Sequence, residues 1–302
     1  MFDFYLNYEY WFAATQLALA MLGMGATLKV RDFVAVAKNP WAISVGVVVQ
    51  VLAVPLVAYV LLAVFSLDTG IAIGLALCAA IPGGTMSNVF TFLGRGHIAL
   101  SIALTGVTTV ACLVTTPIVL GFLISEHMPA DFSMPAASIA LEIALILLLP
   151  LVLGMILLVL APGIAPRISK ICIRTSLFII VLIIVGATGA GRVNLAEFGG
   201  YNLAVLLLFL AVLSNISWLI PWVLRVARPD TTAINIEVTV RNGNLGLLIK
   251  ASMFPAVAGV ADPVGDAVLS TVLLYGGVAL LVGVAQIYVY RYLNRNIPVS
   301  MS

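Results

Sequence analysis

Long apolar runs fill most of this chain and are separated by short charged or Pro- and Gly-rich breaks. A crossing of the bilayer's hydrocarbon core needs about 20 apolar residues, and a segment in lipid has to satisfy its own backbone polar groups, which favours helices. The pattern predicts an all-α integral membrane protein with nine transmembrane helices, at about 11–28, 41–66, 70–94, 98–124, 137–161, 171–190, 201–224, 231–255 and 266–290.

The composition agrees with a membrane-embedded bundle. Of the 302 residues, 63% are hydrophobic and 9% are charged, whereas soluble domains carry roughly 45–50% apolar and about 25% charged residues. The formal net charge is only +2. These values exclude an ordinary soluble enzyme, a disordered chain and a nucleic-acid-binding protein.

Cysteines, histidines and the first residues add three expectations. Cys78, Cys112 and Cys172 lie in apolar runs at wide spacings, so we expect core packing and neither disulfides nor a zinc site. His97 and His127 fall in loops predicted on opposite sides of the membrane, which argues against a membrane metalloenzyme. The first ten residues contain no Lys or Arg, so we expect no secretory signal peptide.

The few charged residues separate by side of the membrane. Alternate connections, with the adjoining helix start at Arg174 and the C-terminal tail, contain 11 of the 14 Lys and Arg residues. The other side has Arg192 and most of the acidic residues. Basic loops face the cytoplasm. We therefore expect a multi-pass protein of the cell inner membrane, with its N-terminus outside and its C-terminus in the cytoplasm.

The third apolar run is interrupted by a Pro-Gly-Gly sequence at 82–84, followed by Thr85, Ser87 and Asn88. Proline removes a backbone donor and glycine permits almost any backbone conformation. The sequence therefore predicts a helix that breaks and restarts near Thr85, leaving unpaired backbone groups on both halves. The alternative is a simple proline kink.

The eighth run carries a dense polar cluster between Asn235 and Asn244, which includes Glu237 and Arg241. Such a cluster cannot face lipid, and ionisable residues inside a membrane are functional by default. Asn and Gly favour a locally unwound backbone. We expect a second broken helix here.

The two breaks occupy matching places if the chain is read as two repeats, 1–124 and 166–302, joined by a connector helix within 125–165. Each break then falls in the third helix of its repeat, and the two helices run in opposite directions. An inverted repeat with paired discontinuous helices is typical of secondary transporters, whose substrate and ions bind near the bilayer midplane.

At these positions the chain resembles the bile acid:sodium symporter family. The motifs are Gly-Met-Gly-Ala-Thr-Leu-Lys at 23–29, Pro-Gly-Gly-Thr-Met-Ser-Asn at 82–88 and Glu-Val-Thr-Val-Arg-Asn at 237–242. The chain looks like a nine-helix version of the ten-helix bacterial members. The resemblance implies a panel sub-domain and a core sub-domain that contains both crossing helices.

The resemblance also implies a first sodium site, formed by Ser87, Asn88, Ser101, Thr105 and Glu237. Hydroxyl, amide and carboxylate oxygens are what a hard cation such as Na⁺ prefers. The alternative is that Ser101 and Thr105 only hydrogen-bond to carbonyls of their own helix.

The family's second sodium site would use Gln50, Glu237, and backbone oxygens of Val238 and Val240, plus a glutamine where this chain has Arg241. A guanidinium only donates hydrogen bonds and cannot ligate Na⁺. Three interpretations remain open. Arg241 replaces the second Na⁺ as a built-in cation paired with Glu237 and Gln50, or it binds an anionic substrate, or it is purely structural.

The other polar groups of the membrane region have simpler expectations. By the resemblance, Asn242 joins Arg241 as a candidate substrate contact. Thr85, at the N–H groups of the restarted helix, and Asn244, at the unwound point, are further candidates. Glu142 and Lys250 are expected to snorkel to the outer interface. His97 is interpreted as a solvated loop residue.

These observations predict a sodium-coupled importer of an organic anion that works by alternating access, with Na⁺ and the lipid bilayer as partners and no enzymatic activity. Members of the family transport bile acids, pantoate, keto acids and sulfated steroids, and the sequence does not select among them or indicate an oligomeric state. The alternatives are a sodium-independent or proton-coupled anion transporter and, more distantly, a membrane receptor or channel.

Overall fold

The computed structural model describes residues 2–29, 40–128, 134–257 and 259–295. Every named element in these ranges is a helix. In chain order they are α1 (Phe2–Gly25), α3 (Pro40–Val48), η1 (Val49–Ala53), α4 (Val54–Val64), α5 (Thr69–Ala80), α6 (Thr85–Leu93), α7 (Ile98–Ile124), α8 (Ala136–Glu142), η2 (Ile143–Leu148), α9 (Leu149–Leu160), α10 (Ala165–Gly189), α11 (Leu195–Phe198), α12 (Gly200–Val223), α13 (Arg228–Thr239), α14 (Gly243–Met253) and α15 (Pro263–Leu293).

Six helical segments of the described chain are long and apolar enough to cross a membrane. They are Pro40–Val64, Ile98–Ile124, Ala136–Leu160, Ala165–Gly189, Gly200–Val223 and Pro263–Leu293. The other three predicted crossings correspond to α1, to α5 with α6, and to α13 with α14. None of these qualifies alone, because α1 carries polar residues and the other two are broken. The all-helical membrane architecture is confirmed, and the count of nine crossings stays a prediction.

The first helix begins earlier than the sequence indicates. We expected it at about residue 11, but α1 starts at Phe2 and includes Glu9. Glu9 is only 5% exposed, because Lys250 and Arg192 lie against its carboxylate. The sequence pattern treated Glu9 as a loop charge, since it could not show these partners. Three other loop charges of the orientation argument, Arg31, Lys38 and Asp131, lie outside the described residues.

Two of the long helices contain a π-helical stretch just before a proline. η1 precedes Pro55, and η2 precedes Pro150. Proline has no backbone N–H to continue the α-helical ladder, and a π-turn absorbs the disturbance. Gln50 lies in η1, so this irregular turn sets the direction of its side chain.

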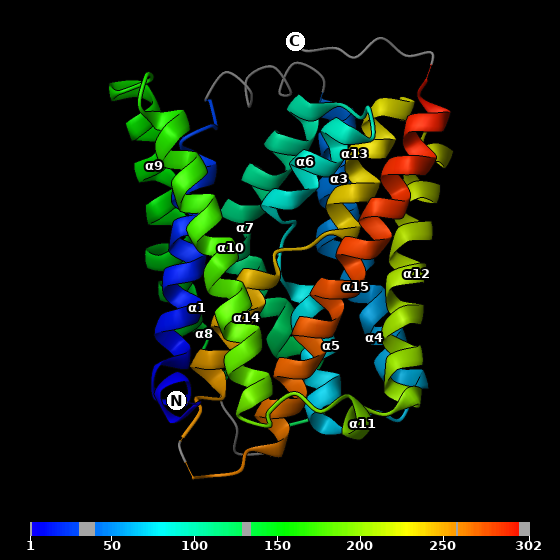
Figure 1. The fold of residues 1–302 in the computed structure, drawn as a ribbon. Helices are drawn as coiled ribbons and strands as arrows, with labels where there is room; N and C mark the ends of the chain where they lie inside the picture. The colour runs from blue at the N-terminus through cyan, green and yellow to red at the C-terminus, as the bar shows by residue number, and fades with distance from the viewer. Residues whose placement is uncertain (1, 30–39, 129–133, 258, 296–302) are drawn as a thin grey trace.

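The helices form two groups, visible in Figure 1. The first helix group contains α1, α8 with η2, α9 and α10, and the second contains the remaining helices. Within the first group, a Cβ on Gly25 would lie 2.0 Å from the carbonyl oxygen of Leu151, so α1 and α9 touch backbone to backbone. The two groups meet mainly through α1 with α14 and through α7 with α8 and η2. These contacts lie toward the end of the bundle at which α1 begins.

Candidate functional site

The expected break in the third run separates α5 from α6. Helix α5 ends at Ala80, and α6 restarts at Thr85 after an extended Pro-Gly-Gly stretch. Glycine is required at 83, because a Cβ there would lie 2.1 Å from the Oε1 of Glu237. A Cβ at Gly84 would lie 2.8 Å from the carbonyl oxygen of Arg241. The break is therefore shaped for close contact with the second broken helix, and it is more than a proline kink.

The second break, between α13 and α14, lies directly against the first. The amide of Gly84 donates to the carbonyl of Val240 at 3.0 Å, and the amide of Asn242 donates to the carbonyl of Pro82 at 2.9 Å. Gly83 and Arg241 form an isolated antiparallel bridge. The two unwound segments thus pair each other's backbone N–H and C=O groups, for which lipid offers no hydrogen-bond partner.

The five residues predicted for the first sodium site come together at this junction. Glu237 is fully buried, and its carboxylate accepts hydrogen bonds from Thr105 at 2.5 Å, from Ser101 at 3.2 Å and from Ser87. The Oδ1 of Asn88 lies 2.8 Å from the Ser101 hydroxyl and 3.3 Å from that of Thr105. Three helices, α6, α7 and α13, supply the set.

This oxygen cluster fits a monovalent hard cation chemically. It combines one carboxylate with neutral hydroxyl and amide oxygens, the donors that Na⁺ takes. A cation would be met by hydroxyl lone pairs after the hydroxyl hydrogens rotate away from the carboxylate. Thr105 also makes the hydrogen bond within its own helix that was the alternative for this residue, since its hydroxyl lies 2.9 Å from the carbonyl oxygen of Ser101.

Arg241 does not form the ion pair with Glu237 that one of its three interpretations includes. Among the described residues, its guanidinium donates hydrogen bonds to carbonyl oxygens at the end of α5, those of Ala79 at 3.1 Å and of Ile81. A cation is favourable there, because the C-terminal end of a helix carries unpaired carbonyls and a partial negative charge. Glu237 is instead occupied by the three hydroxyls, so the spacing of four residues did not decide the pairing.

Gln50 is another residue that the resemblance assigns to the second site, and it lines a cavity together with Arg241. Its Oε1 accepts a hydrogen bond from the amide of Gly83 at 3.1 Å. The Nε2 of Gln50 and the Nε and Nη1 of Arg241 have no hydrogen-bond partner within the described part of the chain. Both residues line a small cavity of about 20 Å³, a volume comparable to one water molecule. Val238 is buried, and the carbonyl of Val240 accepts from Gly84.

The candidate substrate residues lie at the first turns of the two restarted helices. Thr85 begins α6 and Asn244 is the second residue of α14; both are half-buried. Asn242 is buried, and its side chain caps α14 by accepting from the amide of Leu245 at 3.3 Å. A Cβ on the adjacent Gly243 would meet nothing within 4 Å. The start of α14 therefore has open space beside Gly243.

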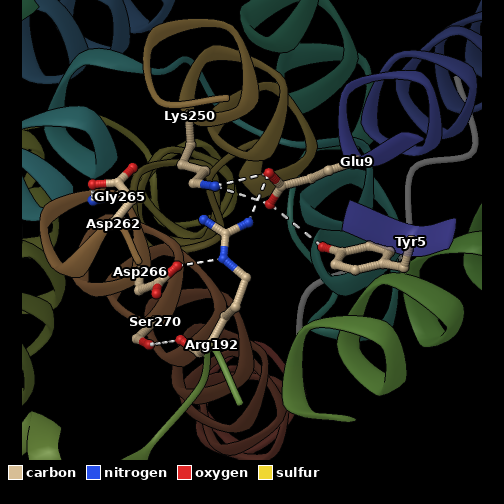
Figure 2. A network of polar contacts seen from close by, with 8 residues as sticks. All are labelled: Tyr5, Glu9, Arg192, Lys250, Asp262, Gly265, Asp266 and Ser270. Carbon is tan, nitrogen blue, oxygen red and sulfur yellow. Dashed lines mark hydrogen bonds and ion pairs between the residues drawn. The ribbon is translucent and has the colours of Figure 1, made fainter. Parts of the chain in front are cut away.

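The snorkelling interpretation of Lys250 is wrong. Lys250 is 1% exposed, and its Nζ lies 2.9 Å from both carboxylate oxygens of Glu9. Figure 2 shows that Arg192 and Asp266 extend this network. The expected scatter of charges at the outer interface is replaced by a buried cluster, whose members come from distant parts of the sequence.

Glu142 and His97 also have partners that their sequence context did not indicate. Glu142 is half-buried and accepts hydrogen bonds from Ser252 at 2.7 Å and from Tyr10 at 3.3 Å, so it is held by protein and does not simply snorkel. The side chain of His97 is 38% exposed, and its Nδ1 lies 2.5 Å from the Oδ1 of Asp230. It is more than a solvated loop residue.

A second polar network was missed by the sequence reasoning. Asn235 belongs to the polar cluster of the eighth run, but its side chain points away from the break, toward α12 and α15. It contacts Ser217, Gln286 and Tyr290, all at 2.8 Å. The polar residues of α13 thus lie on two faces of the helix, one toward α6 and α7 and one toward α12 and α15. Their order in the sequence does not separate the two sets.

The comparisons with known proteins find similarity to sodium-dependent transporters. A sequence model of the sodium bile acid symporter family matches residues 14–198. The chain is 30% identical to an uncharacterized sodium-dependent transporter of Bacillus subtilis, over 82% of this chain and 76% of the relative. It is 30% identical to a probable chloroplastic sodium/metabolite cotransporter of Oryza sativa subsp. japonica, over 88% of this chain and 62% of the relative.

A mammalian relative extends the similarity to named anion carriers. The chain is 28% identical to a sodium-dependent organic anion transporter of Bos taurus, over 68% of this chain and 57% of the relative. The matches to the rice and bovine proteins thus cover less than two thirds of those proteins' length. By the match over more than half of its residues, the chain belongs to the sodium bile acid symporter family, a family of sodium-dependent transporters.

Proposed function

We propose that this protein imports a small organic anion together with Na⁺ by alternating access. One observation carries the proposal: a fully buried carboxylate, Glu237, is surrounded by three hydroxyls at the junction of two broken helices. Ser87, Asn88, Ser101, Thr105 and Glu237 would hold the ion. The names of relatives as organic anion and metabolite cotransporters support the substrate class.

The second proposal is that Arg241 takes the place of a second Na⁺. Its guanidinium lies on the carbonyls at the end of α5, near Gln50, where the resemblance implies a second cation. One Na⁺, Glu237 and Arg241 together carry one net positive charge. Two Na⁺ and Glu237 would carry the same charge. The site therefore keeps an attraction for one anionic group with one ion bound.

The substrate anion would bind at the restarted helices. Thr85 and Asn244 lie at helix N-termini, whose free N–H groups and partial positive charge favour anions. Asn242 contributes by holding the start of α14. Arg241 attracts the anion by its charge, since its hydrogen bonds go to α5.

Coupling would follow from the ion's contacts with three helices. Na⁺ bound to α6, α7 and α13 stabilises the junction whose helix starts receive the anion, so each ligand raises the other's affinity. The panel would be the first helix group and the core the second, moving against each other in a bilayer. An inverted repeat, 1–124 and 166–302 around a connector within 125–165, would give both sides access, with the N-terminus outside the inner membrane and the C-terminus in the cytoplasm.

Thermal unfolding in detergent tests the ion site. NaCl should raise the melting temperature over equimolar KCl, because a ligand of the folded state stabilises it by mass action, by about 2.7 kcal/mol at 100 times its Kd. Glu237→Gln and Ser101→Ala should lose the sodium-specific shift. The matched controls Glu126→Gln and Ser125→Ala, both at exposed positions, should keep it.

A sodium-independent or proton-coupled anion transporter is the alternative. The absence of an ion pair to the buried Glu237 among the described residues is the observation behind it, because such a carboxylate could carry a proton instead of Na⁺. Equal melting temperatures in NaCl and KCl for the unmodified protein would support this alternative over sodium coupling.

A further inference from the structure

We propose that Glu9 and Lys250 form a latch that keeps one end of the bundle closed, and that α1 and α14 have to separate there for the site to open toward that side. The latch is a pair of positioning residues for transport. It rests on the proposed alternating access, and it goes beyond the ion and substrate sites.

The latch is part of a chain of four alternating charges, drawn in Figure 2, of which three are buried and Asp266 is half-buried. The Nζ of Lys250 lies 2.9 Å from both oxygens of Glu9. The Nη1 of Arg192 approaches Glu9 at 2.9 Å as an ion pair without hydrogen-bond geometry, and its Nε contacts Asp266. Lys250, Glu9 and Arg192 are 1%, 5% and 8% exposed. Two cations and two anions balance.

The network joins the two helix groups where they meet. Glu9 belongs to α1 and Arg192 follows α10, both in the first group or at its end. Lys250 belongs to α14 and Asp266 to α15, both in the second group. Because α1 and α14 form one of the main contacts between the groups, the Glu9–Lys250 pair lies across the surface that alternating access would open.

A cavity leads up to this network from one side. It has a volume of about 500 Å³, and its lining residues include Arg192, Asp266, Asp68, Asn194 and Glu197. Glu9 and Lys250 do not line it. The cavity therefore ends at Arg192 and Asp266. In the proposal, Glu9 and Lys250 close the path beyond them. By the charge distribution of the loops, this is the outer end of the protein.

Helix α14 connects the latch to the candidate site. Lys250 lies seven residues after Gly243, the first residue of α14, which corresponds to roughly 10 Å along a helix. The start of α14 is the second break itself, where Asn242 pairs with Pro82. A displacement of α14 away from α1 would therefore open a path from the cavity to the break.

Charged partners suit a contact that has to open. A buried ion pair adds little stability compared with apolar packing, but removing one partner leaves an uncompensated buried charge. The Glu9–Lys250 pair therefore holds α1 and α14 together only when the two side chains face each other. When the helices separate, water from the adjacent cavity can hydrate both charges. An apolar contact would hold the helices without this alignment.

Thiol labelling from the outer side tests the latch. In a chain with Cys78, Cys112 and Cys172 replaced by alanine, Gly243→Cys reports access to the break, because its Cβ has open space. The double substitution Glu9→Gln with Lys250→Met removes both charges and leaves no unpaired one. A membrane-impermeant methanethiosulfonate should then label Gly243→Cys at least tenfold faster than in the latch-intact chain.

Two controls separate opening from general loosening. Thr69→Cys, at an exposed position of the cavity lining, should be labelled equally fast with and without the latch charges. Lys170→Met, an exposed charge on α10, should leave labelling of Gly243→Cys unchanged. An unchanged rate at Gly243→Cys in the double variant overturns the latch, as does an equal increase at Thr69→Cys. The assay needs neither Na⁺ nor substrate, so an absent sodium shift in the thermal assay counts against sodium coupling alone.

Discussion

At the scale of single residues, the same two side chains make the site resemble its family and depart from it. Glu237 accepts hydrogen bonds from hydroxyls of α6 and α7. Arg241, four residues later, turns to the end of α5. Intramembrane charges are costly and mark function. Here the charge of Arg241 is compensated by helix-end carbonyls, whereas that of Glu237 is met by neutral hydroxyls.

Arg241→Gln is the substitution that tests the role of this guanidinium. If Arg241 replaces a second ion, removing its charge should admit one, and the sodium dependence should steepen toward a Hill coefficient of about two. Sodium titration of the purified protein by calorimetry measures this. Arg225→Gln, at an exposed position, should behave as the unmodified chain. A folded Arg241→Gln protein with an unchanged slope would rule out the replacement.

At the scale of elements, broken helices determine where polar chemistry can occur. Each unwound segment exposes backbone groups that the other satisfies, so the two breaks depend on each other. The junction is also held from one end of the bundle. His97, just before α7, contacts Asp230 in the first turn of α13, and its amide donates to the carbonyl of Pro229 at 3.0 Å. These two contacts hold the start of α7 against the start of α13, and both helices belong to the candidate ion site.

Stability should therefore depend on pH through His97. The hydrogen bond and charge of Asp230 raise the pKa of His97 above 6.5, against the effect of burial. The stabilisation is complete below the pKa of the unfolded chain and is lost as the pH rises through the higher pKa of the folded protein. The melting temperature should exceed that of His97→Gln most at about pH 6 and least at about pH 9.

His127→Gln is the matched control, because His127 forms no ion pair among the described residues. It should follow the unmodified protein across the same pH series. A difference between the unmodified protein and His97→Gln that does not change with pH would show that the contact contributes no charge-dependent stability.

At the scale of the whole molecule, two helix groups meet toward one end. The first group is packed through small residues: a Cβ on Gly154 would lie 2.4 Å from the carbonyl oxygen of Leu22 and 2.7 Å from the amide nitrogen of Ala26. Without a hydrophobic force between helices in lipid, such close backbone approach is what holds them. The candidate ion site belongs wholly to the second group.

Gly154→Ala should accordingly separate stability from ion binding. The added methyl meets backbone atoms, which cannot rotate away, and overpacking costs roughly 1–3 kcal/mol. The melting temperature should fall, while the difference between NaCl and KCl persists. Gly276→Ala, in a helix and with nothing within 4 Å of its Cβ, should not lower the melting temperature. Loss of the sodium-specific shift in Gly154→Ala would show that ion binding in the second helix group depends on packing in the first.

The sequence by itself determined the membrane class, the positions of most helices and the two breaks. These follow from apolar run length and from Pro and Gly, which act locally on the backbone. It also named Glu237 and the four residues around it, through the motifs that resemble a known family. The start of α1 was misplaced, because the burial of Glu9 depends on partners more than 180 residues away in the sequence.

Only the tertiary structure decided the partners of the charges. Arg241 is within reach of Glu237 by spacing, yet the end of α5 offers it carbonyls and the hydroxyls of α6 and α7 occupy Glu237. Lys250 is long enough to snorkel, yet Glu9 lies against it. A run of residues specifies which side chains are polar. Which of them meet depends on how helices distant in sequence pack, and burial makes each such pairing decisive.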